Sequence, residues 1–377
     1  MLPNELVAEA ADIVIIGAGF AGAATAYHLA KRGIRDVVVL EAEPRAGVHA
    51  SGKNAALCLQ TIENVDEARL AVEGTRIYAA PPEDLSPRLL LKRQGSLLLA
   101  TEAGRGALDS AARDARALGL ATSMLQREEA VERVALLRDS PFETALFNPE
   151  DGVVDIVALL EGYLAAARRA GAKIRFGELV TAVEVSQGRI ASVTTSRGTI
   201  STPCLVNAAG PWAGEIGRLA GVLDRSIEPR RRHIFQLTTG ATIDPGWPFV
   251  WHSEIDVYFR PEGEGILTSA CDATPHPPEA PSIDPAAEAH LEERLLRAFP
   301  ALAPVRVAAA RACLRTFARD ERFLIGRDAE IDGLVWVAAL GGHGMSTSYG
   351  VGRLGAAAAL GDSSPELERF SPARPSG

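Results

Sequence analysis

Two short runs of consecutive apolar residues stand near the start of the chain, on either side of a glycine turn and an alanine-rich stretch. Residues 13–16 and 37–40 are apolar at every position, and residues 20–30 between them are followed by a basic pair and Gly33. A strand that is apolar throughout is typical of a parallel sheet covered on both faces. Basic residues followed by glycine are a usual helix end. The pattern therefore predicts a unit of strand, glycine turn, helix and strand.

The same patterning predicts elements along the rest of the chain. The proline-rich residues 274–285 favour a loop. Further helices are predicted over residues 107–118, 127–137, 155–171 and 350–360. Further strands are predicted over residues 97–100, 173–176, 180–185, 190–195, 204–207, 229–238, 257–261, 265–269 and 334–339. We expect the strands between residues 229 and 269 to form an antiparallel sheet.

Composition and charge indicate a globular chain and argue against a nucleic-acid partner. The 377 residues are 47% hydrophobic and 23% charged, and a chain of this length forms about two or three domains with a large core. The 39 Lys and Arg residues against 48 Asp and Glu residues give a net charge of −9. An acidic chain is a poor binder of nucleic acid in general.

The cysteines and the N-terminal segment bear on the compartment. Cys58, Cys204, Cys271 and Cys313 are far apart and form no C-x-x-C motif, so we expect reduced thiols and no metal site. Residues 1–11 carry two glutamates and no basic residue, which is unlike a signal peptide. We therefore expect a cytoplasmic protein without a membrane span, and peripheral contact with the inner face of the membrane stays open.

The glycine turn after the first strand carries the first candidate chemistry. Gly17 allows the tight turn, Gly19 lets a pyrophosphate approach the backbone, and Gly22 lets the helix pack close to the sheet. The N-terminus of the helix offers free N–H groups to phosphates. Glu41 closes the next strand, where a carboxylate accepts hydrogen bonds from ribose hydroxyls. The unit thus predicts a dinucleotide site, and the carboxylate argues against a 2′-phosphorylated nucleotide.

Three later segments distinguish FAD from NAD. Residues 51–54, 206–212 and 341–345 are further turns near predicted strand ends. Several backbone approaches suggest a long ligand stretched across the domain. An extended FAD fits that length.

In these motifs the chain resembles the D-amino acid oxidase and glycine oxidase superfamily, and within it the FAD-dependent D-amino acid dehydrogenases of the D-arginine dehydrogenase type. The resemblance spans nearly the whole chain. It rests on GAGFAG at 17–22, SGKNAA at 51–56, DGVVD at 151–155, NAAG at 207–210, Arg231-Arg232, YFRP at 258–261, LRTF at 314–317 and GGHGM at 341–345.

The resemblance implies two domains, both discontinuous in sequence. One is an α/β Rossmann-type FAD-binding domain, expected over residues 1–85, 145–225 and 319–377. The other is an α+β substrate domain with an antiparallel sheet, expected over residues 86–144 and 226–318. The substrate sheet would lie over the flavin.

The resemblance also assigns residues to the cofactor. Lys53 stands where the family often has arginine, and Val180 falls where a backbone amide meets the adenine. The turn at residues 342–345 would face the flavin with a helix N-terminus and stabilise its anionic reduced form. The full set is Gly17, Gly19, Phe20, Ala21, Gly22, Glu41, Ala42, Ser51, Lys53, Asn54, Val180, Ala209, Gly210, Trp212, Gly342, His343, Gly344 and Met345. Some relatives attach FAD through a histidine near His49, but we expect non-covalent FAD.

The resemblance assigns three residues to the substrate. Arg315 matches the arginine that binds the substrate carboxylate, for which a guanidinium offers a bidentate pair. Arg232 is a second cation and Tyr258 a further hydrogen-bond donor to the same carboxylate. His343 is a candidate general base, although hydride transfer from an amine requires no side-chain base.

Two departures put arginine as a substrate in doubt. Leu57 and Ile62 stand where D-arginine dehydrogenase has histidine and tyrosine, which predicts a more apolar pocket. Glu83 or Asp84 would have to replace the glutamate that holds the guanidinium tail.

The expected activity is oxidation of the C–N bond of an amino acid, with a D-amino acid as first candidate, and electrons passing to a quinone or oxygen. A glycine-, sarcosine- or proline-type amine oxidase, the subunit of a multi-component dehydrogenase with a partner subunit, and a 2-hydroxy acid dehydrogenase are the alternatives.

Overall fold

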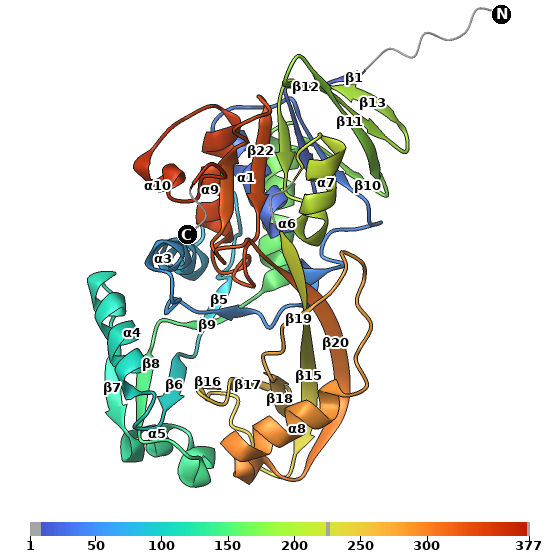
Figure 1. Cartoon of the computed structure of the whole chain (residues 1–377). Coiled ribbons are helices and arrows are strands. Elements are labelled where there is room, and N and C mark those ends of the chain that lie inside the picture. The colour runs from blue at the N-terminus through green and yellow to red at the C-terminus, as the bar shows by residue number, and fades with distance from the viewer. Residues whose placement is uncertain (1–8, 224–226, 375–377) are drawn as a thin grey trace, which may run out of the picture.

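A six-stranded sheet forms the centre of the upper domain in Figure 1. The computed structural model describes residues 9–223 and 227–374, so most of the N-terminal segment considered above lies outside the described residues. Five strands are parallel, and β21 at the edge is antiparallel to β22. The order is β10 (Lys173–Phe176), β3 (Val37–Glu41), β2 (Ile13–Ile16), β14 (Leu205–Asn207), β22 (Leu334–Ala338) and β21 (Leu324–Arg327).

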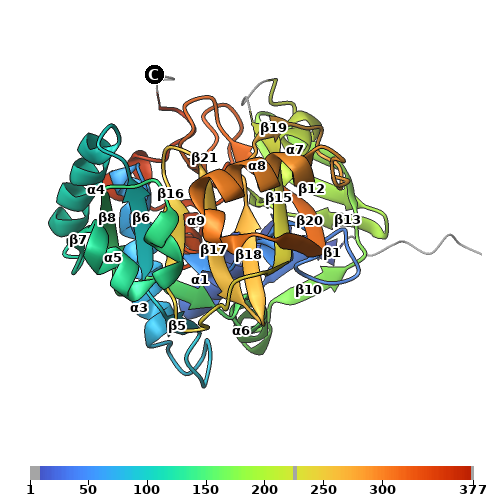
Figure 2. The same cartoon turned by 90° about the horizontal axis from the view of Figure 1, so that it is seen from below.

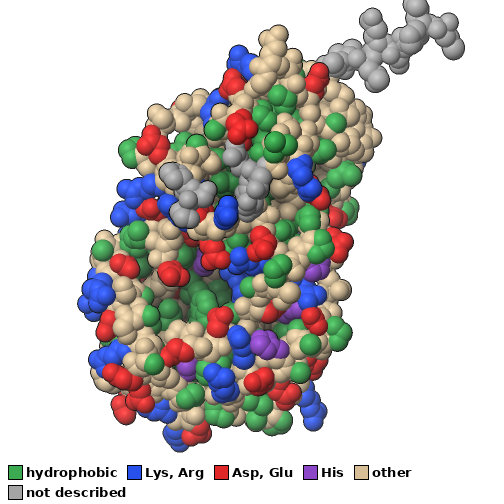
Figure 3. Space-filling model, viewed as in Figure 1, with side chains coloured by type: hydrophobic (Ala, Val, Ile, Leu, Met, Phe, Trp, Pro, Cys, Tyr) green, Lys and Arg blue, Asp and Glu red, His purple; other side chains and the backbone are tan. Residues whose placement is uncertain are grey.

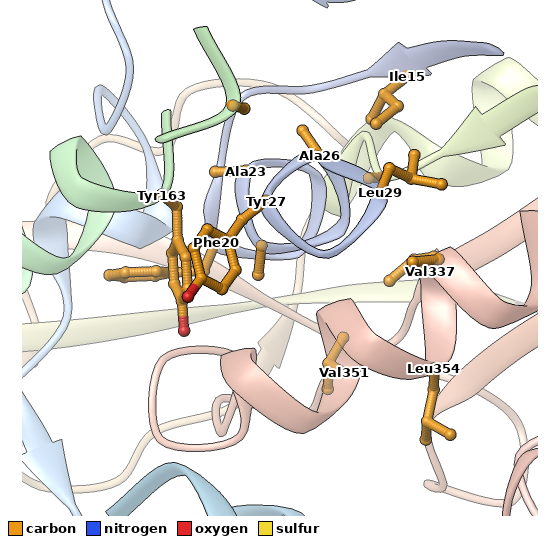
Figure 4. Close-up of a cluster of buried hydrophobic side chains, with 14 of the residues drawn as sticks. Ile15, Phe20, Ala23, Ala26, Tyr27, Leu29, Tyr163, Val337, Val351 and Leu354 are labelled. Atoms are coloured by element: carbon orange, nitrogen blue, oxygen red, sulfur yellow. The ribbon is translucent and has the colours of Figure 1, made fainter. Parts of the chain in front are cut away.

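Both faces of this sheet are covered, as the apolar runs predict. Ile13 and Ile15 face one core, and Val14 and Ile16 face the other. The first core is closed by helices α1 (Phe20–Lys31), α6 (Ile156–Arg169) and α9 (Ser348–Ala359). Figure 4 shows Tyr27 of α1 beside Tyr163 of α6 in this cluster.

The second core lies under a smaller sheet and one helix. These are β1 (Glu9–Ala10), β11 (Val180–Ser186), β12 (Arg189–Thr195), β13 (Gly198–Ser201) and α7 (Ala213–Leu219). The continuous apolar strands are therefore explained by helices on one side and a second sheet on the other.

A large, mainly antiparallel sheet forms the lower domain (Figures 1 and 2). Only the pair of β16 and β6 is parallel among its described strand pairs. The order is β19 (Thr274–Pro275), β15 (Glu228–Thr239), β18 (Gly265–Ser269), β17 (Val257–Glu262), β16 (Phe249–His252), β6 (Ser96–Ala100), β8 (Thr144–Asn148) and β7 (Ser123–Gln126), with β20 (Val305–Phe317) also paired to β15. Helices α4 (Arg105–Ala117), α5 (Arg127–Arg133) and α8 (Ala287–Ala298) accompany it.

Shorter elements join the two domains. A three-stranded sheet contains β4 (Leu57–Cys58), β9 (Gly152–Val154) and β5 (Leu91–Arg93). The remaining helices are α2 (Ala50–Lys53), α3 (Val65–Ala79) and α10 (Pro365–Glu368).

The domain boundary expected between residues 144 and 145 falls inside β8, which pairs with β6 of the large sheet along its whole length.

One predicted helix is shorter than expected. The helix over residues 127–137 ends at Arg133, and a 3₁₀ turn follows over Ala135–Asp139. Val134 between them has φ −136° and ψ 90°, which is an extended conformation. Of the described helices, none is long and apolar enough to cross a membrane.

Asp151 is buried where the three-stranded sheet meets the large sheet. Its carboxylate accepts hydrogen bonds from Ser96 of β6 at 2.6 Å, from Asn148 of β8 at 2.9 Å, and from the backbone and side chain of Gln60. Burial nevertheless raises the pKa of Asp151 to about 7, against the lowering effect of these bonds. A single carboxyl group thus links two strands of the large sheet to the segment that follows β4.

We expect Asp151→Asn to flatten the pH dependence of stability. Because the folded-state pKa lies above the ordinary value of 3.8, the contribution of Asp151 is fully present below pH 3.8 and is lost as the pH rises through about 7. Asparagine does not titrate and can keep the same partners. Denaturant unfolding at several pH values should show that the free energy of unfolding of the variant, relative to that of the wild type, increases by up to ~4 kcal/mol across this window. If the stability of the variant and that of the wild type changed with pH in parallel, the raised pKa of Asp151 would be contradicted.

Candidate active site

A cavity of about 510 Å³ is lined by residues of both domains. The molecular face in Figure 3 is hollowed between the upper and lower domains, and hydrophobic side chains lie in the hollow. Around the cavity stand the β2–α1 turn, the end of β3, the segment around α2, the turn after β14 and the turn before α9. Strands β15, β16, β17 and β20 of the large sheet complete its wall.

The glycine turn at one end has the geometry that its sequence predicts. Gly17 has φ +101°, and a Cβ there would stand 2.4 Å from the carbonyl oxygen of Ala208. A Cβ on Gly22 would stand 1.9 Å from the carbonyl oxygen of Gly17. Helix α1 begins at Phe20, whose N–H donates to Ser51 Oγ at 3.1 Å. The turn and the start of α1 can therefore approach phosphates closely.

Glu41 closes this end of the cavity. Its carboxylate accepts hydrogen bonds from the backbone N–H of Ala18 at 2.9 Å and of Glu43 at 3.0 Å. These bonds fix the side chain at the end of β3, beside the glycine turn. A carboxylate held there has lone pairs left for ribose hydroxyls.

We expect Glu41→Ala to weaken FAD binding about 5- to 150-fold, because an unpaired polar group in a closed site costs roughly 1–3 kcal/mol. Glu41→Gln keeps the shape but has one acceptor oxygen for two backbone N–H groups, so its effect should be smaller than that of alanine. Flavin retention during dialysis, followed by absorbance, measures both variants. Full retention in the alanine variant would show that Glu41 does not contact the cofactor.

Most residues assigned to the cofactor line this cavity. They are Gly17, Gly19, Phe20, Ala21, Glu41, Ala42, Ser51, Asn54, Val180, Ala209, Gly210, Trp212, Gly342, His343, Gly344 and Met345. Gly22 does not line it and instead allows α1 to pack on the turn. Lys53 is also absent from the lining. It ends α2, and its carbonyl oxygen accepts a hydrogen bond from Arg311 at 3.1 Å.

His49 lies in the lining with two partners. Its Nε2 is 2.8 Å from Glu43 Oε1, and its ring centroid is 4.7 Å from that of Trp212. These contacts hold the side chain beside the cavity.

Arg315, Arg232 and Tyr258 meet at the other end of the cavity. Arg315 donates from Nε to the carbonyl oxygen of Gly341 at 3.0 Å, and Arg232 donates from Nε to that of Asp272 at 2.6 Å. Burial and the nearby Arg232 lower the pKa of Arg315 to about 10. Burial raises the pKa of Tyr258, so its hydroxyl stays protonated. This end therefore presents two cations and a neutral O–H donor.

Arg232 differs from its two basic neighbours on β15 in its partners. Arg231 pairs with Asp284, and Arg230 pairs with Glu228 and Glu321. Neither lines the cavity. Alternation along β15 turns Arg231 to the other face, while Arg230 shares the face of Arg232 and is held outside the cavity by its ion pairs.

His343 is a poor general base. Burial, together with Arg315 and Arg232, lowers its pKa to about 3. General bases work best with a pKa near the working pH, so the neutral imidazole offers hydrogen bonding and packing beside the cavity.

An aromatic and aliphatic wall was absent from the sequence expectations. It consists of Leu59, Ile234, Phe249 and Trp251, beside the expected Leu57. The alternation of Phe249 and Trp251 around one valine is the signal that could have indicated it. Ile62 does not line the cavity, and Glu83 and Asp84 line a separate surface hollow. Among the described residues, no group of His, Cys, Asp and Glu side chains is placed to hold a metal ion.

Comparison with known proteins identifies chains that are similar to this one. The profile of the family described as "FAD dependent oxidoreductase" (DAO) matches residues 12–358. Peroxisomal sarcosine oxidase of Homo sapiens is 26% identical over 91% of this chain and 90% of its own length. Mitochondrial dimethylglycine dehydrogenase of Homo sapiens is 28% identical over 69% of this chain.

The chain spans 30% of the length of that dehydrogenase. Among solved structures, L-proline dehydrogenase from P. horikoshii aligns with a TM-score of 0.87 over 97% of this chain and 98% of its own. At 24% sequence identity, the similarity to this L-proline dehydrogenase concerns the fold alone.

Proposed function

The chain belongs to the family of FAD-dependent oxidoreductases, and on that premise we propose that it oxidises the C–N bond of a small amino acid. The observation that carries the proposal is the pair Arg232 and Arg315 with Tyr258, at the end of the cavity away from the glycine turn. Two guanidinium groups and a phenol match a carboxylate in charge and in hydrogen bonding.

FAD is the cofactor of this chain, and the residues of the cavity fit it. Gly17 and Gly22 leave room for the pyrophosphate turn, Glu41 suits the ribose, and the turn at residues 341–345 lies beside Arg315. Bound FAD supplies the acceptor for the hydride of the substrate C–H bond. The imine left behind is hydrolysed by water to a 2-oxo acid or aldehyde and an amine.

The residues of the chain bind and orient the substrate. Arg232 and Arg315 fix the carboxylate, which positions the C–H bond to be broken. The described carboxylates that line the cavity are Glu41, Glu43, Glu178 and Glu215, all in the domain of the parallel sheet. Asp256 accepts a hydrogen bond from Trp251 at 3.2 Å but does not line the cavity. A cationic side chain would therefore meet no acidic residue of the lining beside Phe249 and Trp251, which argues against arginine as a substrate.

This apolar wall supports an N-alkyl or cyclic amino acid as the substrate. Sarcosine, dimethylglycine and L-proline are the compounds in the names of similar proteins. A D-amino acid with an apolar side chain is the second candidate, since the residues that the resemblance assigned to its carboxylate line the same end.

A substrate panel tests the proposal. N-methyl amino acids, proline, both enantiomers of apolar amino acids, 2-hydroxy acids and amines without a carboxylate are each added to the enzyme without oxygen, and flavin bleaching is recorded. Bleaching by amino acids and not by the matched amines is expected. Bleaching by 2-hydroxy acids alone would reject amine oxidation. Release of yellow FAD by acid checks that the cofactor is non-covalent.

A further inference from the structure

Residues 271–284 lie between β18 and α8 and include β19. Their side chains and backbone contact three consecutive residues of β15. Arg231 reaches the carboxylate of Asp284 at 2.5 Å. Arg232 donates to the backbone oxygen of Asp272 at 2.6 Å. His233, which is 2% exposed, contacts both Asp272 and Asp284. The contacts of this segment therefore lie on and around Arg232, the arginine that lines the cavity.

The hydrogen bonds of His233 define how Asp272 is held. The backbone N–H of Asp284 donates to Nε2 at 2.9 Å, so Nε2 is an acceptor and Nδ1 carries the proton. Nδ1 then donates to Asp272 Oδ2 at 2.8 Å, and the backbone N–H of His233 donates to Oδ1 at 2.9 Å. Both carboxylate oxygens of Asp272 are thus bound by one residue of β15.

The backbone before Asp272 is held in an uncommon conformation. Cys271 has φ +50°, which is rare for a residue with a side chain. Its N–H donates to Ser269 Oγ at 3.1 Å, and that hydroxyl donates to the backbone oxygen of His233 at 2.6 Å. Such conformations persist where the surroundings fix them, and they cluster at functional sites.

We propose that the pair His233 and Asp272 positions Arg232 for the substrate. The inference rests on the proposed function, because it makes Arg232 a ligand of the carboxylate. Among the described residues, the guanidinium of Arg232 makes one hydrogen bond, from Nε to the backbone oxygen of Asp272. The N–H groups of its two terminal nitrogens therefore remain available to the substrate, while Nε is held in place.

Positioning is needed because Arg232 and Arg315 repel each other at close range. On the paired strands β15 and β20, Arg232 stands opposite Cys313, two residues from Arg315 on the same face. A long side chain without a restraint would turn away from such a neighbour. The backbone oxygen of Asp272 supplies that restraint, and His233 fixes the orientation of Asp272.

The test measures binding of acetate, with acetamide as its uncharged match, from the change that each causes in the flavin spectrum of the holoenzyme. Asp272→Ala should raise the Kd of acetate about 10-fold and leave that of acetamide unchanged. His233→Asn keeps a donor near Asp272 and should stay within about 3-fold. Asp244→Ala removes an exposed aspartate of the same domain and is the matched control. Substrate KM should rise with that Kd while kcat changes little.

A double variant separates positioning from general stability. If Asp272 acts through Arg232, Asp272→Ala should add less than about 2-fold to the effect of Arg232→Ala on acetate. Full additivity, or normal acetate binding by Asp272→Ala, would overturn the inference while Arg232 remains a ligand. Asp272→Asn, which keeps the volume, replaces the alanine variant if that fails to fold. If the wild type binds acetate no better than acetamide, the proposed function fails and this inference falls with it.

Discussion

Arg315→Ala is expected to lower kcat/KM by at least about 10²-fold while FAD stays bound. A charge-assisted hydrogen bond contributes about 1.5–3 kcal/mol, and misplacement of the substrate adds to this loss. Arg315 is built into the site, since a Cβ on Gly342 would stand 2.2 Å from its Nε. Arg315→Lys should recover part of the activity, because lysine supplies charge without the planar fork.

Arg230→Ala is the matched control for this variant. Arg230 stands directly opposite Arg315 on the neighbouring strand, yet it pairs with Glu228 and Glu321 and does not line the cavity. Its removal should change kcat/KM less than about 3-fold, because its ion pairs with Glu228 and Glu321 lie outside the cavity. Steady-state kinetics with the best substrate of the panel compares the two.

The results for Arg315→Ala and Arg232→Ala together distinguish two ways in which the proposed function can be wrong. Normal kinetics in Arg315→Ala with an inactive Arg232→Ala would show that the carboxylate is held mainly by Arg232. Normal kinetics in both variants would reject the amino acid itself, and an amine without a carboxylate would become the better candidate.

Elements fixed by local patterning could be predicted from the sequence. Strands β2, β3, β14 and β22 are apolar at nearly every position because both of their faces are buried, and that pattern is visible without the fold. Helix α6 was equally clear, since Asp155 caps its start and a basic pair ends it. These strands and the glycine turn carry the cofactor end of the site.

Elements that depend on distant partners were missed. Strands β4 and β5 have two and three residues, too few for a periodic pattern, and both depend on pairing with β9. Helix α8 has seven polar or alanine positions among the eight before its last turn, so its apolar stripe is narrow. In such segments tertiary packing decides the structure more than the local sequence does.

The substrate end shows the same division. Arg315 and Tyr258 were assigned by resemblance, and the cavity contains both. Phe249 and Trp251 were not, because β16 reaches the site through parallel pairing with β6, far away in the sequence. The contact of Asp272 with His233 also joins a loop to a strand across 39 positions, and no local pattern announces it.

Gly22→Ala is expected to abolish FAD retention, which makes it the most damaging small substitution at the cofactor end. Its Cβ would stand 1.9 Å from the carbonyl oxygen of Gly17 and 3.1 Å from Ile15 of β2. The nearer atom belongs to the backbone and cannot rotate away, so α1 must move from the sheet and carry the N–H groups of the turn with it. Overpacking of a tight core costs typically 1–3 kcal/mol, and we expect at least ~3 kcal/mol here, with FAD affinity reduced by about 10²-fold or more.

Gly106→Ala provides the control for this change. Gly106 also lies in a helix, α4, but it is exposed and a Cβ there meets nothing within 4 Å. Because alanine favours helix more than glycine does, this variant should keep its FAD and gain up to ~1 kcal/mol of stability. Thermal melts with and without added FAD compare the two. A Gly22→Ala protein that keeps its flavin and its Tm would mean that the turn and α1 can separate freely, and the tight packing of helix on turn would then not be what holds the phosphate site together.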